Sequence, residues 1–224
     1  MNEKEIIETQ DGSHSIYSSQ FGVTYHSRYG AIQESRHVFI EAGLFYKALT
    51  RKKIAVLEIG LGTGLNALLT YIESQRRQLQ IRYEAVEAFP LTPAQARQLN
   101  HPILLEAGAF QDQFFAIHDA PWGESTKLAA FFEFTKQLGY FEKIDYSPEF
   151  DVVYFDAFAP NAQPELWELP ILKKAYEALA PGGVFVTYCA KGVVKRRLKS
   201  LGFEVEKLQG PPGKREMTRA IKVD

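Results

Sequence analysis

The sequence predicts an α/β fold, with a mostly parallel sheet of seven strands, helices on both faces and a small antiparallel β appendage at the N-terminus. Short apolar runs alternate along the chain with segments whose apolar residues recur at helical spacing. A glycine-rich turn joins the clearest strand directly to a helix, and the chain ends in a pair of strands. This order is typical of a doubly wound, Rossmann-like sheet.

Residues 1–33 are predicted to form the β appendage. Asp11-Gly12 separates two short stretches of alternating polar and apolar residues, which is a hairpin signal, and a third strand candidate follows. The rest of the chain, 34–224, is predicted to be one compact domain, because no linker rich in glycine, serine or proline divides it. The strands expected in the appendage are 6–9, 14–17 and 23–26.

The domain is expected to begin with an amphipathic helix over 34–49, whose apolar residues recur on one face. Strands and helices then alternate. The expected strands are 54–59, 81–87, 127–135, 151–155, 184–188, 203–207 and 217–222, and the further helices are 65–80, 93–99, 111–116, 165–179 and 193–201.

The composition excludes several classes of protein. Of 224 residues, 46% are hydrophobic and 13% aromatic, as in a compact globular protein rather than a disordered one. Cys189 is the only cysteine and the five histidines show no ligand spacing, so we expect neither a disulfide nor a metal site. The chain has no run of about 18 apolar residues and no apolar signal segment, so we expect a cytoplasmic protein without membrane contact.

The strand 54–59 and the turn Gly60-Leu61-Gly62-Thr63-Gly64 form the expected cofactor site. From Leu65 the apolar residues recur at helical spacing, so the turn opens a helix whose backbone N–H groups can approach a nucleotide-like ligand. The spacing differs from the dinucleotide fingerprint, and Asn66 stands where a P-loop has its lysine or hydroxyl. An ordinary strand-to-helix turn is the alternative interpretation.

Acidic residues near this turn indicate which ligand it binds. Glu58, two positions before the first glycine, suits a cation, and S-adenosylmethionine carries both an ammonium and a sulfonium. Glu87 ends the second strand of the domain, where nucleotide-binding α/β folds place the acid that binds the ribose hydroxyls. A solvent-exposed strand-end glutamate is the alternative. The predicted cofactor-binding residues are Glu58, Gly60, Leu61, Gly62, Gly64, Asn66, Glu87, Ala88 and Asp156.

Asp156 is the predicted catalytic residue. It follows the apolar strand 151–155 directly and is itself followed by Ala157-Phe158-Ala159-Pro160, at the sheet edge where such folds bind ligands. A carboxylate there can attract and orient an alkylammonium group and accept its proton, and we expect orientation to outweigh proton abstraction.

Basic residues are concentrated in the last segment of the chain, although the net charge of the whole chain is −1. Clustered lysines and arginines suit a polyanion such as nucleic acid, and a solvated helix face is the alternative. The candidates for phosphate contacts are Lys191, Lys195, Arg196, Arg197, Lys214 and Arg215.

Several motifs together resemble the methyltransferase half of the MnmC family, which includes stand-alone relatives called MnmD. The glycine turn is generic to class I methyltransferases, whereas the two pieces Asp156-Ala-Phe-Ala-Pro160 and Gly213-Lys-Arg-Glu-Met217 are more specific. The resemblance covers nearly the whole chain. Its other parts are the segment from Tyr25 to Phe39, which contains Glu34, then Glu58 to Asn66, Glu87, Pro164-Glu-Leu-Trp167 and Pro181-Gly-Gly183.

The resemblance implies a class I methyltransferase fold and methyl transfer from S-adenosylmethionine to the aminomethyl group on C5 of a wobble uridine in tRNA, often 2-thiolated. The product is 5-methylaminomethyluridine. Bifunctional family members carry a flavin-dependent oxidase half, for which this chain has no residues to spare, so we expect no flavin. The aminomethyl precursor is then expected to come from another enzyme or from a pathway branch that makes it directly.

The aromatic residues Phe158 and Trp167 are counted with Glu34 among the substrate-binding candidates. Their rings can stack an unstacked anticodon base or can belong to the core, and the sequence leaves both interpretations open. Lys191, Arg196, Lys214 and Arg215 complete the RNA-binding candidates.

Three rival functions remain at this point. A polyamine aminopropyltransferase shares the outline of a small N-terminal sheet before a class I fold. It needs a second carboxylate in the loop after the fourth strand, and Asp156-Ala157-Phe158 lacks one. A methyltransferase of small-molecule amines and a catalytically silent tRNA-binding protein are the others. One departure concerns the adenine site: after the third strand the chain has Gln137-Leu138-Gly139-Tyr140, so a backbone carbonyl serves there or the acid is displaced in register.

Overall fold

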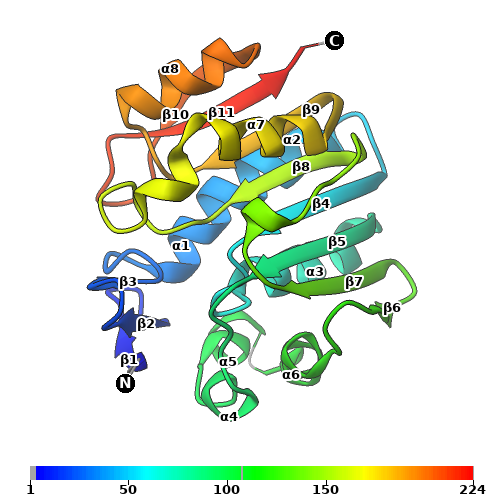
Figure 1. Ribbon diagram of the computed structural model, residues 1–224. Helices are drawn as coiled ribbons and strands as arrows, with labels where there is room; N and C mark the ends of the chain where they lie inside the picture. The colour runs from blue at the N-terminus through cyan, green and yellow to red at the C-terminus, as the bar shows by residue number, and fades with distance from the viewer. Residues whose placement is uncertain (1–3, 107, 224) are drawn as a thin grey trace.

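The computed structural model describes residues 4–106 and 108–223 and contains two sheets (Figure 1). The smaller sheet is antiparallel, in the order β1-β2-β3, and Figure 1 shows it apart from the large sheet, beside the start of helix α1. Its strands are β1 (Lys4–Glu8), β2 (His14–Ser18) and β3 (Val23–Thr24). The predicted antiparallel appendage is therefore present. Ile16 of β2 is 1% exposed and packs into the core of the large sheet, and the division at residue 33 stays a prediction.

The large sheet confirms the predicted fold class. Its order is β10-β11-β9-β8-β4-β5-β7-β6, and the five strands from β9 to β7 are parallel. The strands β6, β10 and β11 run antiparallel to their neighbours. The bounds are β4 (Lys53–Ile59), β5 (Gln80–Glu87), β6 (Ser125–Ala129), β7 (Phe132–Leu138), β8 (Phe150–Phe155), β9 (Leu179–Thr187), β10 (Phe203–Gln209) and β11 (Glu216–Lys222).

The large sheet has eight strands rather than the predicted seven. The stretch 127–135, predicted as one strand, is part of a hairpin in which β6 turns at Ala130-Phe131 into β7. Neither turn residue is one of the usual turn formers, so the reversal left no local signal in the sequence.

Helices cover both faces of the large sheet. One face carries α1 (Ala31–Ser35), η1 (Arg36–Phe45), α2 (Tyr46–Ala48), α3 (Leu65–Arg77) and α6 (Gln111–Asp119), whose apolar residues share a core with Val56, Tyr83 and Tyr154. The other face carries α7 (Leu169–Ala178) and α8 (Gly192–Ser200), packed against Leu57, Val153 and Phe155. Adjacent strand residues thus point to opposite cores, as the pleat requires.

The first helix runs continuously from Ala31 to Ala48, and its middle part, η1, is π-helical. Gly43 lets this part lie close to the sheet, since a Cβ there would be 3.1 Å from side-chain atoms of Tyr154 and Val186. The close approach fixes the N-terminal end of the helix, and with it Glu34, near the ends of the parallel strands.

Three further short elements differ from the prediction. Helix α5 (His101–Glu106) was not predicted, whereas α4 (Pro93–Ala96) was. The predicted helix 165–179 is divided into a 3-10 turn, η3 (Pro164–Trp167), and α7. Pro170 explains the division, because proline fits only the first turn of a helix. A second 3-10 turn, η2 (Phe141–Lys143), follows β7.

Candidate active site

The carboxyl ends of four parallel strands meet around one cavity. Gly60 follows β4, Glu87 ends β5, Gly139 follows β7 and Asp156 follows β8, and all four residues line the cavity. The predicted residues Leu61, Gly62 and Ala88 also line it. The topology therefore assembles most of the predicted cofactor site.

The glycine turn fits closely against its surroundings. Gly60 has a φ of 92°, and a Cβ there would lie 2.9 Å from the carbonyl oxygen of Asp156. Gly62 has a φ of 52°, and a Cβ there would lie 2.9 Å from Cδ1 of Tyr25. Both positions require glycine, because L side chains rarely adopt such φ values and have no space here. The turn thus presents bare backbone to the cavity.

Glu87 is held in place by backbone N–H groups. Its Oε2 accepts a hydrogen bond of 2.8 Å from the Gly62 N–H, and its Oε1 accepts one of 2.6 Å from the Phe89 N–H. The side chain is 7% exposed and borders the cavity. The remaining lone pairs of the carboxylate can accept hydrogen bonds from two vicinal hydroxyls, which is what a ribose offers.

Asn66 connects two carboxyl groups behind the cavity. Its Nδ2 donates hydrogen bonds of 2.9 Å to Oε1 of Glu58 and 2.8 Å to Oδ2 of Asp156. Glu58 is fully buried and its Oε2 has no partner among the described residues. Burial, reinforced by the charge of Asp156, raises the pKa of Glu58 well above its usual value. Its environment therefore favours the protonated form over the carboxylate.

This arrangement changes the interpretation of three predicted cofactor residues. Glu58, Asn66 and Gly64 do not line the cavity, and burial disfavours the charged form of Glu58 that a cationic ligand would need. Glu58 and Asn66 instead orient Asp156, and Gly64 faces His118 underneath the turn. Asp156 does line the cavity, and its pKa is raised to about 7 by burial and by the charge of Glu34, against the Asn66 hydrogen bond and Lys214.

Aromatic rings cover the cavity from the N-terminal side. Phe158 packs against Phe21 with ring centroids 4.6 Å apart and against Tyr25 with centroids 5.0 Å apart. Phe21 also meets the edge of Phe89 at 5.2 Å. Phe21 and Tyr25 come from the appendage, so the small sheet closes one wall of the site. The structure thus places Phe158 at the cavity, although Phe21 was not predicted.

Trp167 belongs to the core. It is 1% exposed, its ring lies 5.0 Å from that of Phe155, and its Nε1 donates a hydrogen bond of 2.7 Å to the carbonyl oxygen of Phe158. A base cannot stack on a buried ring, so the predicted stacking role of Trp167 is wrong and the core alternative is correct. Its indole N–H holds the loop that follows Asp156.

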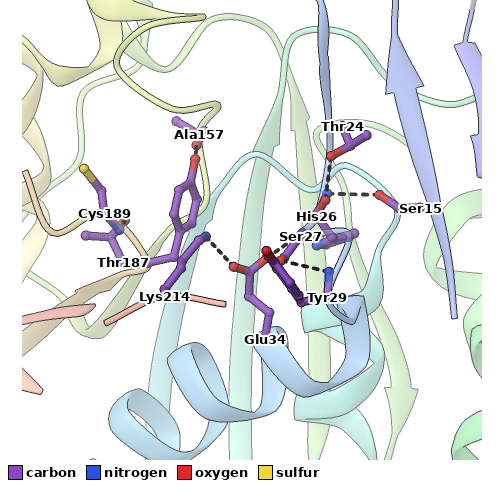
Figure 2. Close-up of polar contacts among 11 residues, drawn as sticks. Ser15, Thr24, His26, Ser27, Tyr29, Glu34, Ala157, Thr187, Cys189 and Lys214 are labelled. Carbon is purple, nitrogen blue, oxygen red and sulfur yellow. Dashed lines mark hydrogen bonds and ion pairs between the residues drawn. The ribbon is translucent and has the colours of Figure 1, made fainter. Parts of the chain in front are cut away.

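Glu34 and Lys214, two predicted substrate-binding residues 180 positions apart, form an ion pair beside this loop (Figure 2). Glu34 Oε2 also accepts a 2.8 Å hydrogen bond from the Ser27 N–H. Lys214 Nζ lies 3.8 Å from the centroid of the Tyr188 ring, and the Tyr188 hydroxyl donates a 2.7 Å hydrogen bond to the carbonyl oxygen of Ala157. The pair therefore sits next to Asp156.

The predicted basic residues divide into two groups. Lys191, Lys214 and Arg215 line an apolar groove together with Tyr188 and Pro160. Arg196 is exposed and borders a neighbouring depression that shares Ala190 and Glu216 with the groove. These positions are accessible to an RNA backbone.

The other two predicted phosphate contacts have structural partners. Lys195 is 7% exposed and paired with Glu216 at 2.7 Å. Arg197 donates to the Trp167 carbonyl oxygen at 2.9 Å and is paired with Glu168 at 2.6 Å. Both residues hold α8 to the rest of the fold, so the structure does not support them as phosphate contacts.

Comparisons with known proteins agree with this site. The profile of a family described as S-adenosyl-L-methionine-dependent methyltransferase matches residues 126–223. The bifunctional protein MnmC of Marinomonas sp., named for tRNA 5-methylaminomethyl-2-thiouridine biosynthesis, is 27% identical over 215 residues, 90% of this chain and 32% of the relative. The crystal structure of MNMC2 from Aquifex aeolicus is 28% identical with a TM-score of 0.79, over 98% of this chain and 70% of that chain.

The chain is thus similar to S-adenosylmethionine-dependent methyltransferases. The predicted resemblance to the methyltransferase half of MnmC and the predicted cofactor are confirmed. The chain spans about a third of the length of the curated relatives that it matches. Spermidine synthase from Thermotoga maritima shares the fold, with a TM-score of 0.58 at 16% identity over 99% of this chain and 69% of that chain.

The protein has a further carboxyl group at the cavity that sequence reasoning missed. Glu142 lies in η2, lines the cavity, and has a buried Oε2 without a hydrogen-bond partner among the described residues. An unpartnered acceptor suits an amino group such as that of adenine. This acid was expected directly after β7, where the chain has Gln137-Leu138-Gly139-Tyr140. It instead lies a few residues further on, in η2.

Three buried histidines lie under the glycine turn. His26 Nε2 is hydrogen-bonded to Oγ1 of Thr63 at 2.7 Å, and His118 Nε2 donates to the Thr63 carbonyl oxygen at 3.1 Å. Neither ring nitrogen of His101 has a partner among the described residues. Within residues 4–106 and 108–223, no three histidine, cysteine or acidic side chains are grouped to hold a metal ion, and no helix is long and apolar enough to cross a bilayer.

Glu87→Gln is expected to weaken S-adenosylmethionine binding by about tenfold or more, because an amide offers fewer acceptor lone pairs to the ribose hydroxyls. Isothermal titration calorimetry measures this. Glu133→Gln, at an exposed position of β7, is the matched control and is expected to bind as the wild type does. Wild-type affinity in Glu87→Gln would contradict the ribose assignment.

Proposed function

We propose that the protein methylates the primary amine of 5-aminomethyluridine, with or without 2-thiolation, at the wobble position of tRNA in the cytoplasm. The observation that carries the proposal is the position of Asp156, a partly buried carboxyl group at the cofactor cavity next to the pair Glu34 and Lys214. Lys191, Lys214 and Arg215, which line the neighbouring apolar groove, suit the phosphates of a nucleic acid. The names of the MnmC and MNMC2 relatives support the same substrate.

The residues present fit the cofactor. Glu87 and Glu142 offer acceptors for ribose and adenine, and the glycine turn leaves bare backbone along the cavity. When bound, S-adenosylmethionine supplies an electrophilic methyl group. The protein must therefore present an amine nitrogen with a free lone pair.

Asp156 meets this requirement. An alkyl amine is mostly protonated to the ammonium near neutral pH, and its nitrogen becomes nucleophilic only after the proton is lost. The pKa of Asp156 is raised to about 7, so above pH 7 it is mostly a carboxylate that attracts the ammonium, and it is a stronger proton acceptor than an ordinary aspartate. Asn66 donates to Oδ2 of Asp156 and so fixes the carboxyl group while it takes up or releases the proton.

Methyl transfer to tRNA tests the proposal. The purified protein is incubated with labelled S-adenosylmethionine and tRNA from cells blocked before the last wobble step, and the nucleosides are analysed by mass spectrometry. We expect 5-methylaminomethyluridine to appear, and no label to enter tRNA that lacks the aminomethyl group. If the protein binds the cofactor and leaves both tRNAs unmodified, the tRNA substrate is wrong, and labelling of a small primary amine would identify the alternative.

A further inference from the structure

The ammonium group of Lys214 occupies a site with the chemistry of an alkylammonium receptor. A carboxylate oxygen of Glu34 lies on one side and the ring of Tyr188 on another, with Nζ 3.8 Å from the ring centroid. A carboxylate and an aromatic face together are a common way to bind an ammonium group. Figure 2 shows Lys214 and Glu34 pointing toward one another, with Ala157 nearby.

The receptor is built on rigid parts of the fold. Glu34 is 5% exposed and its second oxygen is held by the Ser27 N–H at 2.8 Å. The Tyr188 hydroxyl is tied to the carbonyl oxygen of Ala157, the neighbour of Asp156. Lys214, in contrast, is 31% exposed along its side chain and reaches the site on a flexible stem. The lysine can leave while its receptor stays.

We propose that the ammonium group of Lys214 occupies the binding site of the substrate ammonium. When the substrate binds, its ammonium group displaces Lys214 from Glu34 and Tyr188. This inference rests on the proposed function in that the incoming group is the aminomethyl ammonium of the nucleoside. Exchange conserves charge: one ammonium replaces another at a buried carboxylate that would be strongly destabilising if left unpaired. Lys214 thus keeps Glu34 paired in the empty enzyme.

A neighbouring groove can receive the displaced side chain of Lys214. Lys214 borders the groove that is also lined by Lys191 and Arg215, so its ammonium can move from Glu34 to a phosphate of a bound RNA. The RNA then assists the exchange, because its phosphate attracts the group that blocks the amine site. A nucleoside without neighbouring phosphates lacks this assistance, which favours tRNA over free nucleosides.

Replacement of Lys214 by methionine tests the receptor without any methylation step. We expect the melting temperature of Lys214→Met to fall by roughly 5–10 °C, because Glu34 loses its partner. Methylammonium chloride should restore it, whereas tetramethylammonium chloride at equal ionic strength should not, because that ion donates no hydrogen bond to the carboxylate. Wild type and the double variant Glu34→Gln/Lys214→Met should not respond. Equal stabilisation of all three proteins by methylammonium, or of none, would overturn the proposal.

Kinetics test the exchange itself. In Lys214→Met the KM for 5-aminomethyluridine should fall about tenfold, because the competitor is gone, and the KM for tRNA should rise about tenfold, because a phosphate contact is lost. A merely structural role would move both values in the same direction, and that result would overturn the exchange. Lys127→Met, at an exposed position of β6, is the matched control.

Two further outcomes are distinguishable. If neither substrate is methylated by the wild type, the proposed function fails while the melting experiment still judges the receptor. If Lys214→Met is too unstable to purify, the neutral double variant replaces it: its KM for the nucleoside should rise at least about tenfold, since Glu34 no longer carries a charge. An unchanged KM would overturn the proposal.

Discussion

Asp156→Asn is expected to lose methyl transfer and, at pH 8, to be more stable than the wild type. The catalytic loss follows from the removal of the group that attracts the ammonium and accepts its proton, and such groups contribute about 100-fold to 10,000-fold in rate. The asparagine can still accept the 2.8 Å hydrogen bond from Asn66 Nδ2, so the site keeps its shape.

The stability gain follows from the raised pKa of Asp156, about 7 in the folded protein against an ordinary value near 3.8. Between these values the unfolded chain has lost the proton while the folded chain retains it, so wild-type stability falls as pH rises through this range. The difference corresponds to roughly 4 kcal/mol at most, and we expect about half of it after relaxation. Above pH 7 the variant should therefore be about 2 kcal/mol more stable, a rise in melting temperature of roughly 4–8 °C.

Urea unfolding at pH 5 and pH 8, together with the tRNA assay, measures both effects. The advantage of the variant should be larger at pH 8 than at pH 5. Glu133→Gln, an exposed change, should alter neither quantity by much. A variant that is less stable than the wild type at both pH values would mean that the carboxylate stabilises the fold, contrary to its burial.

The residues at the strand ends could be predicted because their positions follow from local signals and topology. A buried strand and the glycines after it are visible in the sequence from Ile54 to Gly64, and Glu87 and Asp156 end two other recognisable strands. Once the strands are parallel, their carboxyl ends must share an edge of the sheet. The individual residues that line the cavity at these strand ends could therefore be predicted from the sequence.

Contacts that depend on packing between distant segments were not predictable in the same way. Glu34 and Lys214 were each placed among the substrate candidates, yet no local pattern shows that helix α1 and the loop before β11 bring them together. Trp167 could equally be core or surface in the sequence. Its burial depends on Phe155 beneath it and on the Phe158 carbonyl that accepts its N–H.

Buried charge also depends on the whole fold. Glu58 looks like a counter-ion for a cationic cofactor because an acid precedes a glycine turn. In the structure the side chain is covered completely and the nearby Asp156 opposes its ionisation. A sequence motif gives the residue type and the position, whereas the protonation state is set by neighbours that only the packed structure supplies.

His101→Leu is expected to make the protein less sensitive to acid. His101 is fully buried with both ring nitrogens unpartnered among the described residues, and burial holds its pKa well below the usual value. Leucine has a similar volume, and no hydrogen bond from the described residues is lost in the exchange. The variant is therefore expected to fold at pH 7.5 at least as stably as the wild type.

The pH dependence has a defined sign. Below a pKa of about 6.5 the unfolded chain gains a proton on His101 while the folded chain remains neutral there, so the wild type loses stability as pH falls. At pH 5 this loss amounts to about 2 kcal/mol. His26 and His118, whose pKa values burial lowers to about 4, add losses in the same direction.

Urea unfolding at pH 7.5 and pH 5 measures the stability that each protein loses between the two pH values, and the losses of the variant and the wild type are then compared. The stability that His101→Leu loses between the two pH values should be smaller than the wild-type loss by about 2 kcal/mol. Asp156→Asn provides a control of opposite sign, because removal of a carboxyl with a raised pKa should increase the acid-induced loss. If the wild type and His101→Leu lose the same stability, His101 is protonated in the folded protein. The buried site under the glycine turn would then have to contain an acceptor for that proton.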